Sequence, residues 1–350
     1  MTDGRNEHKY GTGHEDGLTP LVPLDPNRTT SVDALVRAMS KTAFGGRRLG
    51  EAADVLEHMI RDRDCYRVVT VSGAMTVAKQ GLLLCEMIER GWVQAVVSTG
   101  ALMTHGLSES AGMLHFQHRV GMQDEDLYDR GYNRVYDTIE LEKNLDDVER
   151  ILQLALDDLP EGTTLCSRLV CELLGRYLQK HSPARGILKS ALEHNVPVYV
   201  PAFTDSELGL DVSIHNHLRA QKGQSRFSFD PFLDLDDFAN RIRDQERMGI
   251  FTIGGGVPRN WAQQVAPYLE ILRSRLGGSE PVRRYRYAVR ICPEPEHWGG
   301  LSGCSYSEGV SWGKFVPESE GGRFAEVFAD ATIAWPLIVR AVIERLDANP

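Results

Sequence analysis

Long apolar runs are missing from this chain. No segment reaches the length of a membrane-spanning helix, and the N-terminus has no apolar stretch of the kind that a secretory signal contains. We therefore expect a cytoplasmic protein with no membrane partner. The 6 cysteines show no metal-ligand spacing, and several lie inside apolar segments. Reduced thiols that pack as small buried side chains are the expected state.

A surplus of positive charge is missing as well. The formal net charge is -10, which argues against nucleic acid as a partner and is compatible with a cationic ligand.

Signals for a metal site are also weak. His215 and His217 stand close together, but no cysteine or carboxylate at a suitable spacing completes a ligand set. The sequence therefore predicts no metal site.

The chain has enough apolar residues for a sizeable core. It contains 350 residues, of which 42% are hydrophobic. Residues 1–25 are rich in Gly, His, Asp, Glu and Pro and have few apolar positions, which is typical of a mobile arm. We assign residues 26–350 to one domain.

Short β-rich segments alternate with amphipathic helical segments from residue 50 to the C-terminus. This alternation predicts an α/β fold, a single doubly wound Rossmann-like domain whose mainly parallel sheet is flanked by helices. Pro197 and Pro201 disrupt pairing, so the third strand is expected to be short or near an edge. The predicted strands are residues 66–71, 93–97, 196–200, 249–253, 287–291 and 325–328, and the clearest helices are 51–63, 165–179 and 331–346.

A charge-rich segment, residues 125–160, separates the second predicted strand from the third. Its acidic side chains include Glu125, Glu140 and Glu149. We expect solvated helices there, which cover the sheet and carry no chemistry.

Small polar residues and glycines follow the predicted strands. The carboxyl ends of parallel strands share one edge of the sheet, where ligands bind, and glycines let the backbone approach a phosphate closely. A triple glycine alone is typical of a tight turn, and this one is not the GxGxxG fingerprint. Taken together, however, the loops favour a nucleotide-binding edge. They are Ser72-Gly73, Thr99-Gly100, Asp205, Gly254-Gly255-Gly256 and Asp330-Ala331.

Lys314 is the only lysine after Lys222, in a stretch that uses arginine freely. Arginine serves wherever a fixed positive charge suffices, whereas a desolvated lysine can lose its proton and attack an imine or carbonyl. Lys314, which directly follows Trp312 and Gly313, is therefore a candidate nucleophile. The alternative is a surface lysine in a glycine-containing turn.

Four motifs resemble the deoxyhypusine synthase family. They are SEGVSWGK at 307–314, GGGV at 254–257, PAFTD at 201–205 and FADA at 328–331. The resemblance extends from about residue 65 to the C-terminus and implies NAD as cofactor and spermidine or a related polyamine as substrate. In the family, the lysine that matches Lys314 carries an aminobutyl group as an imine. The family also forms homotetramers with active sites at subunit interfaces, so the resemblance implies a tetramer or dimer here.

The resemblance assigns roles to further residues. Glu308 and Trp312 would act beside Lys314 and contact the substrate, and a neutral Lys314 is expected to be buried next to Trp312, which would lower its pKa. His105 is a candidate general base near the cofactor edge, or a structural histidine. The expected NAD-binding residues are Ser72, Gly73, Thr99, Gly100, Asp205, Gly255, Asp330 and Ala331.

Several family positions are substituted in this chain. The two pocket glutamates of the family read Thr104 and His105, a substrate-orienting histidine reads Asn260, and an aspartate before the catalytic segment reads Leu301. The lost carboxylates would pair with ammonium groups, so the amine is held differently or is a different amine. Glu294, Glu296 and Asp211 could replace the lost carboxylates. The alternative is that each is a solvated carboxylate in a loop.

The leading hypothesis is therefore an NAD-dependent aminobutyl transferase. The acceptor would be the lysine of a hypusine-type translation factor, or a small diamine such as putrescine, which would make the enzyme a homospermidine synthase. A non-catalytic NAD-binding protein and an NAD-dependent amine dehydrogenase remain further alternatives.

Overall fold

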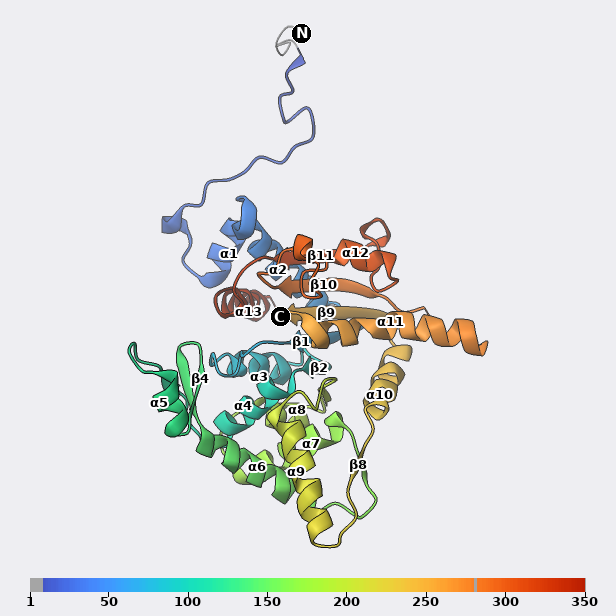
Figure 1. Cartoon of the computed structure of the whole chain (residues 1–350). Helices are drawn as coiled ribbons and strands as arrows, with labels where there is room; N and C mark the ends of the chain where they lie inside the picture. Colours follow the sequence, from blue (N-terminus) through green and yellow to red (C-terminus); the bar gives the residue numbers. More distant parts are fainter. Residues whose placement is uncertain (1–8, 280–281, 350) are drawn as a thin grey trace, which may run out of the picture.

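A six-stranded sheet runs through the computed structural model, which describes residues 9–279 and 282–349 (Figure 1). All neighbouring strands pair in parallel. Each predicted strand is present, with small shifts at its ends. The strands are β1 (Cys65–Val71), β2 (Ala95–Ser98), β7 (Val198–Tyr199), β9 (Arg247–Ile253), β10 (Tyr285–Ile291) and β11 (Arg323–Val327).

The strands lie in the order β11-β10-β9-β1-β2-β7. When these six strands are numbered 1 to 6 along the chain and the sheet is followed from β7 to β11, the order is 3-2-1-4-5-6. This is the strand order of doubly wound, dinucleotide-binding sheets, so the predicted fold class is confirmed. The direction of winding reverses between β1 and β9. At the other end, β7 has only 2 residues and forms an edge of the sheet, as Pro197 and Pro201 predicted.

Alternate residues of the strands enter two different cores. Val69 and Val71 of β1 face the larger core, whereas Val68 faces the smaller one. α2 (Phe44–Arg61) and α13 (Ala331–Ala348) pack on the first face against β10 and β11. α11 (Gly256–Leu276) packs against β1 and β2 on the second face, next to α10 (Phe232–Arg243). Both faces of the sheet are thus covered.

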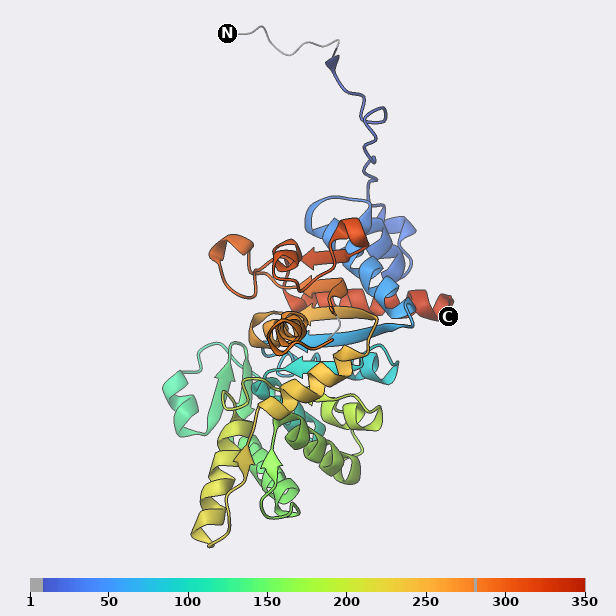
Figure 2. The same ribbon diagram turned by 90° about the vertical axis from the view of Figure 1, so that its right-hand side faces the viewer.

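The remaining elements extend the molecule on either side of this sheet. In Figure 1, α6 (Glu142–Asp157) to α9 lie below β1 and β2, whereas α1 and α12 lie above the sheet centre, on the same side as β10 and β11; Figure 2 shows the same division. These elements are α1 (Val32–Ser40), α3 (Gly81–Glu89), α4 (Gly100–Ser110), α7 (Ser167–His181), α8 (Ile187–Glu193), α9 (Glu207–Gln221) and α12 (Tyr306–Ser311), with β6 (Thr164–Leu165), β8 (Ser228–Phe229) and the short 3-10 turns η2 (Pro26–Arg28), η3 (Glu296–Trp298) and η4 (Glu318–Glu320).

The segment 125–160 differs from the prediction of solvated helices. α5 (Asp124–Asp129) and α6 (Glu142–Asp157) are helical, but β4 (Tyr132–Val135) and β5 (Thr138–Leu141) form an antiparallel hairpin, with β3 (Phe116–Gln117) paired to β5. The many acidic residues hid the β-rich run around the turn at Tyr136. Glu140, in β5, is 1% exposed, so the acidic side chains of this segment are not all solvated.

The N-terminal residues that the structure describes, 9–25, are mostly exposed and follow an extended path away from the body (Figures 1 and 2). Residues 1–8 of the expected mobile arm lie outside the described residues, so the mobility of the arm stays a prediction. The assignment of residues 26–350 to one domain also stays a prediction.

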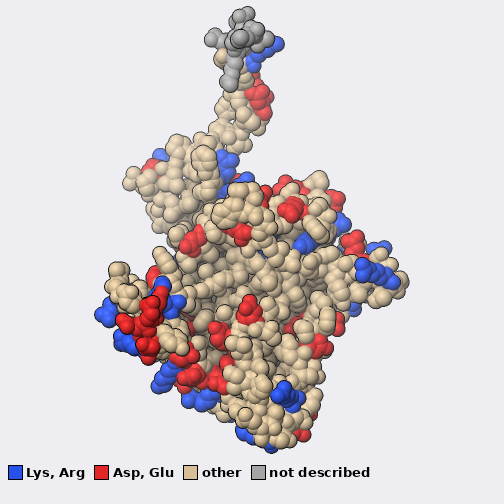
Figure 3. Space-filling view, viewed as in Figure 1, with Lys and Arg blue, Asp and Glu red and all other residues tan. Residues whose placement is uncertain are grey.

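Acidic and basic side chains do not separate into two poles on the face shown in Figure 3. They gather together over α5 and β4, while the middle of that face is mostly uncharged. Among the described residues, no helix combines the length and apolar character needed to cross a membrane.

Candidate active site at the carboxyl edge of the sheet

The loops after β1 and β9 meet where the strand order reverses. The Ser72 amide donates to the Ile253 carbonyl, and the Gly255 amide donates to Ser72 Oγ at 2.8 Å. Gly254 has a φ of +81°, and a Cβ added there would lie 2.3 Å from Ser72 Oγ, so both conformation and space favour glycine. Ser72-Gly73 and the triple glycine, which are far apart in the sequence, therefore contact each other at the carboxyl edge of the sheet.

Gly255 is needed for a different reason. Its backbone is extended, with a φ of -178°, which any residue can adopt. A Cβ added to Gly255 would instead lie 2.5 Å from Ser302 Cβ. The segment 301–304 thus crosses directly over the triple glycine.

Two buried arginines hold this crossing segment in place. Arg259 donates to the carbonyls of Leu301, Ser302 and Cys304, the last at 2.5 Å. Arg290 donates to the Ser302 and Cys304 carbonyls at 2.6 and 2.9 Å. Arg290 also pairs with Glu326, which accepts from the Tyr306 amide at 2.9 Å. The arginines therefore fix the chain just before α12, which leads to Lys314.

Lys314 lies in a buried position, with 8% of its surface exposed. Its Nζ donates to Asn260 Oδ1 at 3.1 Å. Asn260 belongs to the N-terminal part of α11, the helix that begins at the triple glycine. The main chain of Lys314 is tied at both ends, because its amide donates to the Gly309 carbonyl and its carbonyl accepts from the Tyr285 amide. The sequence thus directs an isolated lysine inward and gives it a neutral partner.

Burial is the main cause of a lowered pKa for the Lys314 ammonium, and the nearby positive charge of Arg259 lowers that pKa further. Cys304 and the carboxylate of Glu308 act in the opposite direction. Because the neutral partner Asn260 does not favour the charged form as a carboxylate would, more of the nucleophilic free amine is present at a given pH.

Trp312 does not bury Lys314, contrary to expectation. Its side chain is 65% exposed, at the C-terminal end of α12. Gly313 has a φ of +70° and turns the chain between the two residues, so the lysine enters the protein while the indole stays outside. Glu308 is also exposed, although its charge reaches Lys314.

The remaining predicted cofactor residues lie along the same edge. Thr99 caps α4 by accepting from the Leu102 amide, and a Cβ on Gly100 would lie 2.0 Å from Ser206 Oγ. Asp330 caps α13 by accepting from the Thr332 amide at 2.7 Å. Asp205, in the loop after β7, is exposed. Ala331, the first residue of α13, is 8% exposed.

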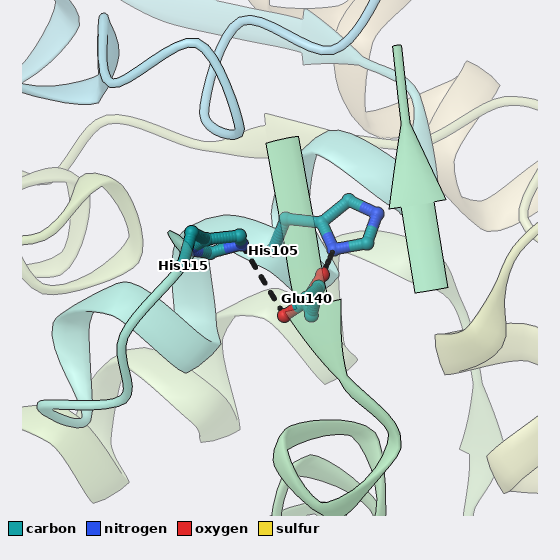
Figure 4. Close-up of side chains that lie close together, drawn as sticks. All are labelled: His105, His115 and Glu140. Carbon is teal, nitrogen blue, oxygen red and sulfur yellow. Dashed lines mark ion pairs between the residues drawn. The ribbon is translucent and has the colours of Figure 1, made fainter. Parts of the chain in front are cut away.

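His105 lies on the second turn of α4 in a cluster with His115 and Glu140 (Figure 4). His105 Nδ1 contacts Glu140 Oε2, and His115 Nε2 lies 3.3 Å from Glu140 Oε1. Burial disfavours the charged forms, but the contacts outweigh it: the pKa of His105 is raised and the pKa of Glu140 is lowered. α4 and α12 lie on opposite sides of the sheet centre in Figures 1 and 2, so one chain does not bring His105 to Lys314.

The proposed substitute carboxylates have different surroundings. Asp211 lies in α9 rather than in a loop and is only 9% exposed. Burial, together with the charges of Glu149 and Glu207, raises its pKa to about 7. Glu296 lines a cavity of 400 Å³ with Glu318 and Glu326, while Glu294 packs against Gly300. His215, one of the histidines considered as a ligand, stacks on Phe227 inside the same helical layer as Asp211.

Comparison with known proteins agrees with these motifs. Residues 34–342 match the family model "Deoxyhypusine synthase". A "Probable deoxyhypusine synthase 2" of Methanosarcina acetivorans is 33% identical, over 93% of this chain and 90% of that protein. A "Deoxyhypusine synthase-like protein" of Chlorobaculum parvum is 30% identical, over 88% of this chain and 85% of that protein.

A solved structure gives the same result for the fold. The "putative deoxyhypusine synthase" of Entamoeba histolytica superposes with a TM-score of 0.60 at 13% identity, covering 93% of this chain and 97% of that chain. The family model spans most of the chain, and the relatives align along nearly their whole length. The chain therefore belongs to the deoxyhypusine synthase family.

Proposed function

We propose that this protein is an NAD-dependent aminobutyl transferase of the deoxyhypusine synthase type, with Lys314 as the covalent carrier. Membership of the family implies a transferase, and the observation that carries the finer proposal is the burial of Lys314 against Asn260. A lysine nucleophile needs desolvation to become neutral. The lowered pKa of Lys314 supports the same role.

The edge residues fit a dinucleotide. Glycines at 100, 254 and 255 let the loops at the strand ends pack closely against neighbouring serines. The strand order reverses at Ser72 and Gly255, the point where doubly wound sheets bind dinucleotides. NAD bound there would accept a hydride from the polyamine and later return it. Ser72, Thr99, Asp205 and Asp330 would contact its polar groups from neighbouring strand ends.

Lys314 would attack the imine carbon of the oxidised polyamine. A bond forms between Nζ and that carbon, and the bond to the departing diamine breaks. Asn260 Oδ1 accepts a hydrogen bond from Nζ and so directs the amine. The exposed Glu308, whose charge acts on Lys314, would hold a cationic amine at the entrance or take up the proton.

The assembly belongs to the same proposal. Trp312 is 65% exposed and lies two residues from the nucleophile. In a homotetramer with shared active sites, a second copy would cover this indole and close the pocket. Trp312 could then hold an ammonium group over its face, the arrangement that a cation–π contact needs.

A small diamine such as putrescine is a second candidate acceptor, beside the lysine of a hypusine-type translation factor. The substituted pocket favours it, because Thr104, Asn260 and Leu301 carry no charge where the family has carboxylates and a histidine. A buried carboxylate lost opposite an ammonium costs several kcal/mol. A pocket changed in this way suits a different amine.

Product analysis tests the proposal. The protein is incubated with NAD and labelled spermidine, alone, with putrescine, or with a translation factor of the hypusine type. Transfer of label to either acceptor, lost in Lys314→Arg, is the expected result. Free aminoaldehyde with unmodified acceptors would point to an amine dehydrogenase instead. NAD binding without polyamine turnover would point to a non-catalytic protein.

A further inference from the structure

A buried cluster of two imidazoles and one carboxylate lies apart from Lys314 (Figure 4). His105 comes from α4, His115 from the segment just before β3, and Glu140 from β5. The ligand atoms His105 Nδ1, His115 Nε2 and a Glu140 oxygen all lie within 4.8 Å of one another. Three elements that are separate in sequence thus point nitrogen and oxygen atoms at one place.

Hydrogen bonding does not account for these atoms. His105 Nδ1, His115 Nε2 and Glu140 Oε2 are buried without a hydrogen bond of acceptable geometry, although they lie close together. The side chains of His115 and Glu140 are each 1% exposed. Only Glu140 Oε1 accepts a clear bond, from Ser108 Oγ at 3.1 Å. The two histidines are held by ion-pair contacts to one carboxylate, and buried polar atoms without a well-formed hydrogen bond call for an explanation, of which a bound ion is one.

The chemistry of the donor set selects the ligand. Two imidazole nitrogens and one carboxylate suit zinc and other first-row transition ions, while magnesium and calcium prefer oxygen atoms alone. Three protein ligands leave at least one coordination position for water. The side chain of His105 is 14% exposed, which gives an ion a way in.

We propose that His105, His115 and Glu140 bind one divalent transition-metal ion, with zinc as the best match. The ion would join α4 to the three-stranded sheet of β3, β5 and β4. This departs from the sequence-based prediction of no metal site, which considered the cysteines, His215 and His217. The spacing of the three ligands follows no known short motif, so the folded chain was needed to bring them together.

Lys79 is the group that competes with the metal. Its Nζ lies 2.8 Å from His115 Nδ1 and 3.4 Å from Glu109 Oε1. An ammonium can only donate, so in this arrangement His115 Nδ1 accepts and Nε2 keeps its proton. Metal binding requires the other tautomer, with the proton on Nδ1 and the lone pair on Nε2. Lys79 would then turn to Glu109, and His105 would release its proton to solvent.

The test uses untagged full-length protein, since a histidine tag binds metals. After treatment with a chelator, the protein is titrated with Co²⁺ and Zn²⁺, and visible absorption and bound metal are measured. We expect one equivalent of either ion, with Zn²⁺ displacing Co²⁺. His115→Ala and Glu140→Gln should lose that equivalent. His215→Ala removes another buried histidine and should keep it.

Lys79→Met keeps all three ligands and removes the competing ammonium. It should bind Zn²⁺ more tightly than the wild type, because no ammonium then holds His115 in the competing tautomer; groups around a ligand alter metal affinity by about tenfold or more. Because this variant retains the whole cluster, it stays informative even if Glu140→Gln fails to fold. Absence of a stoichiometric site in the wild type and in Lys79→Met, or binding that survives His115→Ala, would overturn the proposal.

Discussion

At the scale of single residues, the pairing of Lys314 with Asn260 is the feature that most affects reactivity. A carboxamide oxygen accepts a hydrogen bond from the amine without adding negative charge. Burial then lowers the pKa of Lys314, and the opposing charge of Glu308 does not reverse the effect. Asn260 therefore orients the amine through a hydrogen bond and adds no charge beside it.

Replacing Asn260 by aspartate should raise the pKa of Lys314. An opposite charge at hydrogen-bond distance favours the ammonium form by about 1 to 3 pKa units. The free amine would then appear only at higher pH, so the acidic limb of the pH profile for polyamine turnover should move upward by a similar amount. Asn240→Asp on the exposed side of α10 is the matched control and should leave the profile unchanged. A profile that stays in place in Asn260→Asp would contradict the assigned contact.

The sequence predicted Lys314 as a nucleophile but did not predict its surroundings, and the role itself stays a prediction. The isolated lysine left a surface position open as an alternative, and the resemblance of SEGVSWGK to the family decided between the two. Trp312 was placed wrongly because the left-handed turn at Gly313 separates it from Lys314. His115 and Glu140 were missed because their partner His105 comes from another element, and no local spacing connects the three.

At the scale of elements, the segment 301–304 depends on arginines from its neighbours. Arg259 comes from α11 and Arg290 from β10, and both donate to main-chain carbonyls of the segment. A loop without strands or helices has few internal hydrogen bonds, so these side chains supply the partners that its carbonyls need. The position of α12, and with it Lys314, follows from this arrangement.

Substitution of Arg290 by methionine should destabilise the protein strongly. The Arg290 side chain is 1% exposed, and its removal leaves Glu326 without its cation and two carbonyls without donors. Breaking such a buried pair costs about 3 to 5 kcal/mol. Urea unfolding measures this cost. In Arg28→Met, where the arginine is 88% exposed in its pair with Asp25, the loss should stay within about 1 kcal/mol. Similar losses in both variants would argue against a structural role for Arg290.

At the scale of the whole molecule, the fold was more predictable than the site. Strand positions follow from local runs such as 249–253 before the triple glycine, and the alternation with helices requires a parallel sheet. The hairpin of β4 and β5 was missed because its acidic residues outweighed a short β-rich pattern. Contacts between distant segments, such as Ser302 over Gly255, depend on tertiary packing that no local pattern records.

Deletion of residues 1–20 should leave the stability of the body nearly unchanged. The described part of this segment is mostly exposed, whereas Val22, which is kept, bonds to the Lys41 carbonyl. Calorimetry should give one unfolding transition with a midpoint within about 2 °C of the full chain, since a change of 1 kcal/mol shifts a protein of this size by no more than that. Two separate transitions would contradict the assignment of residues 26–350 to one domain.

Covalent trapping at Lys314 tests the central claim most directly. The protein is incubated with NAD and isotope-labelled spermidine, reduced with borohydride, digested, and the peptides are weighed by mass spectrometry. The account predicts an aminobutyl adduct on Lys314 that requires NAD and is absent from Lys314→Arg. An unmodified Lys314 in protein that binds NAD and consumes the polyamine would contradict it.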